Sequence, residues 1–225
     1  MSNKNSENLG DKNFPNLEVE TEREFKYIAD ENVTLESIIE FFVGNGGVTM
    51  SPSNTTYKYE TYYDDENFTI AKRGDVLRQT KAEFPTGTAE FFLYKRNISD
   101  KDSNFVKKTE LKIETVDLAI VEKILDGHIP SEVKPVLNAK MTRNRALVEF
   151  DGVEFELVID RTEYSVEDGE TATDVMVEME VNPQIGADID ISTIHNVIVK
   201  FPNLVATKVS KYERGCELLE IFKVQ

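Results

Sequence analysis

Four charged residues occupy every second position near the N-terminus, in the segment Glu20-Thr-Glu22-Arg-Glu24-Phe-Lys26. On a β-strand, residues two apart share a face, and a rise of about 3.3 Å per residue places their Cα atoms about 6.5–7 Å apart. Two glutamates at that spacing can converge on one hard cation, which prefers oxygen ligands. The segment therefore predicts a strand face that can bind a divalent metal.

The same alternation recurs later in the chain. Glu178 and Glu180 share one face of a second predicted strand, and Glu156 and Asp160 share one face of a third. Basic residues lie on other predicted strands or at their ends: Arg78, Lys95 with Arg96, the pair Arg143 and Arg145, and Lys208 with Lys211. One further predicted strand carries a row of mixed charge, made of Lys108, Glu110, Lys112 and Glu114. The residues thus supply paired carboxylates together with Arg and Lys from many strands.

Two arrangements are compatible with these charged rows. A charged stripe opposite an apolar stripe is usually the solvated face of an amphipathic strand, and periodicity does not tell which face points inward. The alternative is a barrel whose strands each contribute charged side chains to a common lumen. Such a lumen suits a triphosphate, because Arg and Lys hold phosphate oxygens and carboxylates hold the metal that bridges them. In that case the apolar faces point outward, beneath helices.

Alternating polarity and turn residues predict a mainly β (α+β) chain, of the kind found in barrels and sandwiches. The predicted strands are Leu17–Ile28, Thr55–Asp64, Val76–Phe84, Glu90–Arg96, Val106–Glu114, Asn144–Phe150, Glu154–Asp160, Asp174–Val181 and Val205–Ser210. The predicted helices are Thr34–Val43, capped by Thr34, then Asp117–Asp126, a short Ser131–Ala139, Asp190–Lys200 and Tyr212–Phe222. Polar loops are expected at Asn97–Phe105 and Glu167–Thr173.

Composition limits the classes of partner. The 225 residues, 40% of them hydrophobic, suit one domain, expected over residues 17–225 after a polar, disordered tail at 1–16. A net charge of −16 argues against nucleic acid and anionic membranes as partners, but permits a small anionic ligand where basic residues gather. With one cysteine, Cys216, no intramolecular disulfide can form, which favours a cytoplasmic location. Apolar outer faces would permit a homodimer.

The order of several short motifs resembles that of the CYTH superfamily, or triphosphate tunnel metalloenzymes. This group includes class IV adenylate cyclases, thiamine triphosphatases and inorganic triphosphatases. The segment Glu22-Arg-Glu24-Phe-Lys26 resembles the family's N-terminal Glu-x-Glu-x-Lys signature. Further similar elements follow in the family's order: Tyr62-Tyr63-Asp64-Asp65, Asp75-Val-Leu77-Arg78, Leu93-Tyr94-Lys95, Lys108-Thr-Glu110, Arg143-Asn-Arg145, Leu157-Val-Ile159-Asp160, Glu178-Met-Glu180 and Ser210-Lys211-Tyr212. The resemblance covers roughly residues 17 to 215.

The resemblance implies a closed eight-stranded antiparallel β-barrel tunnel with flanking helices, and it implies a role for each matching residue. Mg²⁺ or Mn²⁺ is expected as the cofactor. The implied metal ligands are Glu22, Glu24, Asp160, Glu178 and Glu180. The implied phosphate-binding residues are Lys26, Arg78, Lys95, Arg143, Arg145 and Lys211. The implied catalytic residues are Glu22, Glu24, Lys26 and Asp160, and the role of Glu110 stays open between metal, water and salt-bridge partner.

The leading function implied is metal-dependent hydrolysis of inorganic triphosphate, thiamine triphosphate or a nucleoside triphosphate. One alternative is a cyclase that makes cyclic AMP and pyrophosphate from ATP, for which no adenine-binding set is evident. Another is a module that binds triphosphate or polyphosphate without turnover. Three departures from the family pattern bear on the substrate: Thr80 replaces a common second arginine, Lys112 a common acid, and Asp65 the usual threonine.

Overall fold

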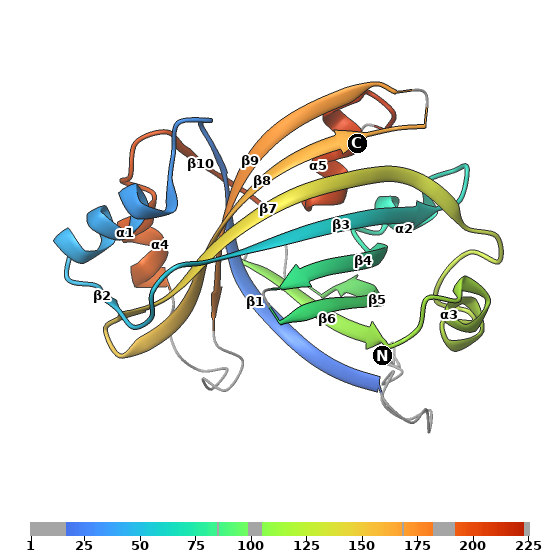
Figure 1. Ribbon diagram of the computed structural model, residues 1–225, viewed down its shortest axis with the longest axis horizontal. Coiled ribbons are helices and arrows are strands. Elements are labelled where there is room, and N and C mark those ends of the chain that lie inside the picture. Colours follow the sequence, from blue (N-terminus) through green and yellow to red (C-terminus); the bar gives the residue numbers. More distant parts are fainter. Residues whose placement is uncertain (1–16, 85, 99–104, 168, 182–191, 223–225) are drawn as a thin grey trace, which may run out of the picture.

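A computed structural model describes residues 17–84, 86–98, 105–167, 169–181 and 192–222 of the chain (Figure 1). The tail expected at 1–16, most of the loop at 99–104 and the expected helix start at 190–191 lie outside these ranges. The strands of the described part are β1 (Leu17–Ala29), β2 (Val48–Thr49), β3 (Asn54–Asp64), β4 (Val76–Phe84), β5 (Gly87–Asn97), β6 (Val106–Ile113), β7 (Lys134–Phe150), β8 (Val153–Ser165), β9 (Thr171–Val181) and β10 (Leu204–Thr207). The helices are α1 (Leu35–Gly44), α2 (Thr69–Lys72), α3 (Leu118–Ile124), α4 (Ser192–Ile198) and α5 (Lys211–Leu218).

Eight of the strands form a closed antiparallel barrel, in the order β1-β6-β5-β4-β3-β7-β8-β9. Pairing of β1 with β9 closes it, with Lys26 opposite Glu178 and Glu24 opposite Glu180. The short strands β10 and β2 add to β1 and β7 outside this cycle. The expected eight-stranded antiparallel barrel is therefore confirmed.

Closure decides which face of each strand points inward. On β1, Phe25 and Tyr27 pack in an apolar core outside the barrel, so Glu24 and Lys26 at the alternate positions face the lumen. On β9, Val177 is part of the same outer core, while Glu178 lines the lumen. The arrangement with charges inside and apolar faces outward is the one that the chain adopts.

Helices cover two of the outer apolar faces (Figure 1). Residues of α1 and α4 pack on β1, β7, β8 and β9 in one core, and α3 packs on β3, β4, β5 and β6 in another. The third core differs, because Tyr212 and Cys216 of α5 pack with Tyr62, Leu137 and Tyr164, which lie on lumen-facing positions of their strands. Helix α5 therefore lies against the inner side of the barrel at one end.

Most predicted helices are present, with shifted ends. Thr34 caps α1 as expected, through a hydrogen bond from the backbone N–H of Ser37. Asp117 caps α3, and α5 ends at Leu218 rather than at Phe222. The short elements β2 and α2 were not expected from the sequence.

The predicted helix at Ser131–Ala139 is wrong, because residues from Lys134 onward belong to the 17-residue strand β7. The cause is pairing with β3, which extends to Asp64 opposite Lys134. The register shifts between Tyr62 and Tyr63, next to Pro135, which cannot donate a backbone hydrogen bond. Cross-strand pairing here overrides the local helical pattern.

No helix in the described ranges is both long enough and apolar enough to cross a membrane.

Candidate active site in the barrel lumen

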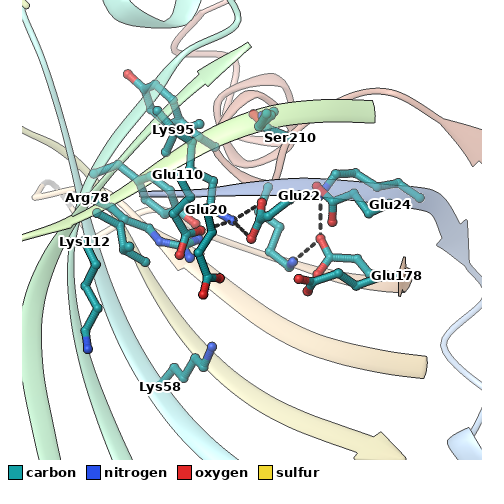
Figure 2. Close-up of a pocket in the computed structure, with 18 of the residues that line it drawn as sticks. Glu20, Glu22, Glu24, Lys58, Arg78, Lys95, Glu110, Lys112, Glu178 and Ser210 are labelled. Atoms are coloured by element: carbon teal, nitrogen blue, oxygen red, sulfur yellow. Dashed lines mark hydrogen bonds and ion pairs between the residues drawn. The ribbon is translucent and has the colours of Figure 1, made fainter. Parts of the chain in front are cut away.

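A cavity of about 250 Å³ occupies the barrel lumen (Figure 2). Its basic lining residues are Lys26, Lys58, Arg78, Lys95, Lys108, Lys112, Arg143 and Lys211, and its acidic ones are Glu20, Glu22, Glu24, Glu110, Glu178 and Glu180. Basic residues thus outnumber acidic ones in this lining, whereas the whole chain has 26 Lys and Arg against 42 Asp and Glu. Eight of the 26 Lys and Arg residues of the chain line this one cavity.

One ion-pair network joins β1, β5 and β6. The Lys95 Nζ lies 2.7 Å from a carboxylate oxygen of Glu22 and 2.6 Å from one of Glu110 (Figure 2). Burial opposes the charge of Lys95, but the two carboxylates raise its pKa above the ordinary value. Burial also opposes ionisation of Glu110, yet Lys95 lowers the pKa of that carboxyl to about 2. In this arrangement Glu110 is a salt-bridge partner, one of the roles left open for it.

A second network centres on Glu178 of β9. Its carboxylate accepts from Lys26, whose Nζ lies 2.6 Å away, and also from the ammonium of Lys211. Lys26 is in addition 2.8 Å from Glu24, its neighbour two positions back on β1. Although Glu178 is buried, Lys211 and Lys26 hold the pKa of its carboxyl well below the ordinary value.

Arg143 of β7 connects this network to Asp160 of β8. Its guanidinium donates from Nε to Oδ1 at 2.9 Å and from Nη2 to Oδ2 at 2.7 Å, and Nη2 also lies 3.1 Å from Glu178. The Lys211 Nζ is 2.9 Å from the same Asp160 carboxylate. Asp160 is fully buried and does not itself line the cavity; against burial, Arg143 and Lys211 lower its pKa to about 2. Its observed contacts are with cations that line the cavity.

A third pair lies on β3 and β4. The Arg78 Nη1 is 3.2 Å from Glu60, and the Tyr62 hydroxyl donates to the same carboxylate at 2.6 Å. Burial would raise the pKa of Glu60, but Arg78 and Lys58 lower it. The Nε of Arg78 is buried without a hydrogen-bond partner in the described structure. That donor is available to a ligand oxygen.

Two lining lysines have lowered pKa values. Burial and the nearby charge of Arg143 lower the pKa of Lys58 to about 7. Burial and Lys26 lower that of Lys108 to about 8. Unlike Lys26 and Lys95, these two lysines do not gain enough from carboxylates to offset desolvation. An anionic ligand would supply the missing negative charge.

The acidic side of the lumen contains Glu180 close to Glu22 and Glu24. Burial and the negative charge of Glu22 raise the pKa of Glu180 to about 8, with Lys95 opposing and Glu24 adding to the effect. In the described part of the chain Glu180 forms no ion pair, and no three Asp, Glu, His or Cys side chains are already arranged around a metal position. The donor chemistry nevertheless fits a divalent cation, because carboxylate oxygens that repel one another are hard ligands whose repulsion a cation relieves. The predicted metal ligands stay a prediction.

Helix α5 brings its N-terminus to one end of the cavity. Ser210 caps it by accepting from the Glu213 backbone, and the Glu213 carboxylate accepts from the Ser210 backbone. The Tyr212 hydroxyl donates to Asp64 at 3.0 Å, and the Tyr212 ring stacks on Tyr62 with centroids 5.1 Å apart. These contacts fix Lys211, and the positive end of the helix dipole favours an anion at that end.

The structure brings together most of the residues predicted from the sequence. The predicted residues that line the cavity are Glu22, Glu24, Lys26, Arg78, Lys95, Glu110, Arg143, Glu178, Glu180 and Lys211. Arg145 does not line it: its guanidinium lies 2.9 Å from Glu156 and 2.9 Å from Asn54. The predicted phosphate contact of Arg145 therefore stays a prediction.

Sequence reasoning missed Lys58 and Glu60 on β3. The signal was present, because Thr56, Lys58, Glu60, Tyr62 and Asp64 alternate on one strand face. The motif that resembles the family begins only at Tyr62, near the end of that strand.

Comparison of the sequence with protein-family models gave no match, and comparison with curated proteins gave no significant match. Solved structures do match. A protein from Pyrococcus horikoshii OT3 is 21% identical over 89% of this chain and 99% of its own, with a TM-score of 0.55. A candidate adenylyl cyclase from Hippeastrum, whose structure is described as revealing a dominant triphosphatase activity, is 12% identical over 91% of this chain and 97% of its own, with a TM-score of 0.50. The chain therefore shares the closed barrel fold of these two proteins.

Proposed function

We propose that the protein hydrolyses a triphosphate inside the barrel with the help of Mg²⁺ or Mn²⁺. One observation supports this above the others: eight Lys and Arg side chains line a cavity of about 250 Å³ in a chain whose net charge is −16. A protein this acidic has no general affinity for polyanions, so a basic lumen indicates a site for one small anion. The volume is below the range of about 300–1,000 Å³ typical of drug-sized ligands, which favours a compact group such as a triphosphate.

The basic side chains bind the phosphates. Arg143 presents a planar fork that matches two phosphate oxygens, and Lys26 and Lys211 add point charges beside it. In the free protein these cations are held by Glu178 and Asp160, so the lumen is already organised when the ligand arrives. Binding then exchanges carboxylate contacts for phosphate contacts at these cations.

The acidic side chains hold the metal in this proposal. The first candidates are Glu22, Glu24 and Glu180, whose carboxylates lie close to one another. Glu178 and Asp160 are the further predicted ligands. When bound, the cation would polarise a phosphoryl oxygen and offset the charge that develops on it. Glu22 or Glu24 orients a water molecule and accepts its proton as the water oxygen bonds to phosphorus. The phosphoanhydride bond breaks, and Lys26 stabilises the leaving oxygen, so that triphosphate and water give pyrophosphate and orthophosphate.

The test is a product assay with inorganic triphosphate, thiamine triphosphate and ATP, each with Mg²⁺ or Mn²⁺. Orthophosphate, pyrophosphate and cyclic AMP are quantified for the wild type, Glu24→Gln and Lys26→Met, with Lys81→Met as the control on the exposed outer face of β4. Metal-dependent orthophosphate release that both lumen variants lose and the control keeps supports the proposal. Cyclic AMP with pyrophosphate would instead identify a cyclase, and binding without any product would identify a non-catalytic module.

A further inference from the structure

Lys58 projects from β3 into the cavity on the side away from Glu22 and Glu24 (Figure 2). It lies two lumen-facing positions before Tyr62, which packs against α5. With a rise of about 3.3 Å per residue, these four residues place Lys58 about 13 Å along the strand from the end where α5 lies. Along β3, Lys58 therefore lies farther from α5 than Tyr62 does.

The charges around Lys58 are mostly committed to other partners. Arg143 is held by Asp160 and Glu178, and Arg78 is held by Glu60. No carboxylate in the described ranges lies within ion-pair distance of the Lys58 ammonium. Lys26 and Lys211 share Glu178 and Asp160 with Arg143, so these carboxylates are already occupied by other cations.

We propose that Lys58 is a substrate-binding residue that contacts the phosphate farthest from α5, and that the free protein leaves its ammonium without an ion pair for this purpose. The inference rests on the proposed function, because it assigns a role within the same cavity. It adds a binding residue that the sequence motifs did not include.

The energetic argument is that an unpaired lysine among protein groups costs stability in the free protein. The lowered pKa of Lys58, caused by burial and by Arg143, reports this cost. A phosphate oxygen beside Lys58 removes the cost by forming a charge-assisted hydrogen bond. The pKa of Lys108 is also lowered by burial and by a cation, but that cation is Lys26, which lies 2.8 Å from the predicted metal ligand Glu24. The strongest charged neighbour of Lys58 is Arg143, on the adjacent strand β7.

Three variants separate charge from shape and from nonspecific effects. Lys58→Met removes the charge with little change in length, Lys58→Arg keeps the charge, and Lys81→Met removes an exposed charge from the adjacent strand β4. Binding of inorganic triphosphate is measured by calorimetry without metal, so that turnover does not interfere. Thermal unfolding of each free variant is measured alongside.

We expect the Kd of Lys58→Met for inorganic triphosphate to rise about 10- to 100-fold, the range for a lost hydrogen bond between charged groups. Lys58→Arg should stay within about threefold of the wild type, and Lys81→Met should be unchanged. Free Lys58→Met should unfold at the same or a higher temperature than the wild type, whereas a lysine with a purely structural role would lose stability.

Arg143→Met distinguishes failure of this inference from failure of the proposed function. If Arg143→Met loses affinity while Lys58→Met binds like the wild type, the role of Lys58 is overturned and the lumen site stands. Equal losses in Lys58→Met and Lys58→Arg would also overturn it, because the charge would not matter. If the wild type itself does not bind triphosphate, the inference and the proposed function both fail.

Discussion

Gly215 lies in α5 where this helix packs against the inner side of the barrel, and its replacement by alanine sets two effects against each other. A Cβ atom at this position would lie 2.6 Å from the Leu137 Cδ2 and 2.6 Å from the Tyr164 Cδ1. Carbon atoms in contact are normally about 3.5–4.0 Å apart, so the helix or its neighbours must move by about 1 Å. Both neighbours are fully buried, which leaves little room for that movement.

The expected net effect of Gly215→Ala is a loss of about 1 kcal/mol in the free energy of unfolding. Overpacking of a core costs about 1–3 kcal/mol, while alanine in a helix gains about 0.8–1.0 kcal/mol over glycine. For a domain of this size the loss corresponds to a fall in Tm of about 2–4 °C. Movement of α5 should also displace Lys211 from Glu178 and Asp160, and so raise the KM for triphosphate.

Urea unfolding and steady-state kinetics measure the two consequences. Gly44→Ala is the matched control, since Gly44 ends α1 and a Cβ there would meet no atom within 4 Å. The control should be as stable as the wild type or slightly more stable. If Gly215→Ala is also as stable as the wild type and its KM is unchanged, the close packing of α5 inside the barrel is refuted.

Three further predictions concern the lumen charges. Glu178→Gln removes the negative charge that Lys26, Arg143 and Lys211 share. It should therefore lower the free energy of unfolding, measured by urea titration, by about 3 kcal/mol. A loss below about 1 kcal/mol would contradict the network described. Glu180→Gln should raise the Mn²⁺ concentration for half-maximal hydrolysis at least about tenfold, while EDTA should abolish hydrolysis but not triphosphate binding; an unchanged Mn²⁺ requirement would remove Glu180 from the metal ligands. The pKa of Lys58 is about 7 in the folded protein and 10.5 ordinarily. Between these two pH values the folded state binds fewer protons than the unfolded state, so the contribution of Lys58 to the free energy of unfolding rises with pH. Triphosphate binding at pH 8 should therefore take up about one proton more in the wild type than in Lys58→Met, as calorimetry in buffers of different ionisation enthalpy would show, and equal proton uptake would contradict the lowered pKa.

Period-two alternation was enough to place charged residues on shared strand faces. It grouped Glu22, Glu24 and Lys26 correctly, because side-chain direction in a strand depends only on local backbone geometry. The capping residues Thr34 and Asp117 marked two helix starts for the same local reason. The resemblance to the tunnel superfamily then supplied the closed barrel, which local patterns had left open against a sandwich.

Tertiary structure decided which strand faces point inward, which segments pair as strands and which charges meet. The inward direction of the charged rows depends on the closure of β1 with β9, a pairing between residues about 150 positions apart in sequence, such as Lys26 and Glu178. The local pattern at Ser131–Ala139 predicts a helix, because the pairing of the strand from Lys134 with β3 does not show in nearby residues. The lack of an ion pair at Lys58 within the described residues likewise follows from which carboxylates on neighbouring strands Arg78 and Arg143 take up. Sequence spacing fixes which side chains share a face, but the partners of a charge depend on long-range distances that only the closed barrel sets.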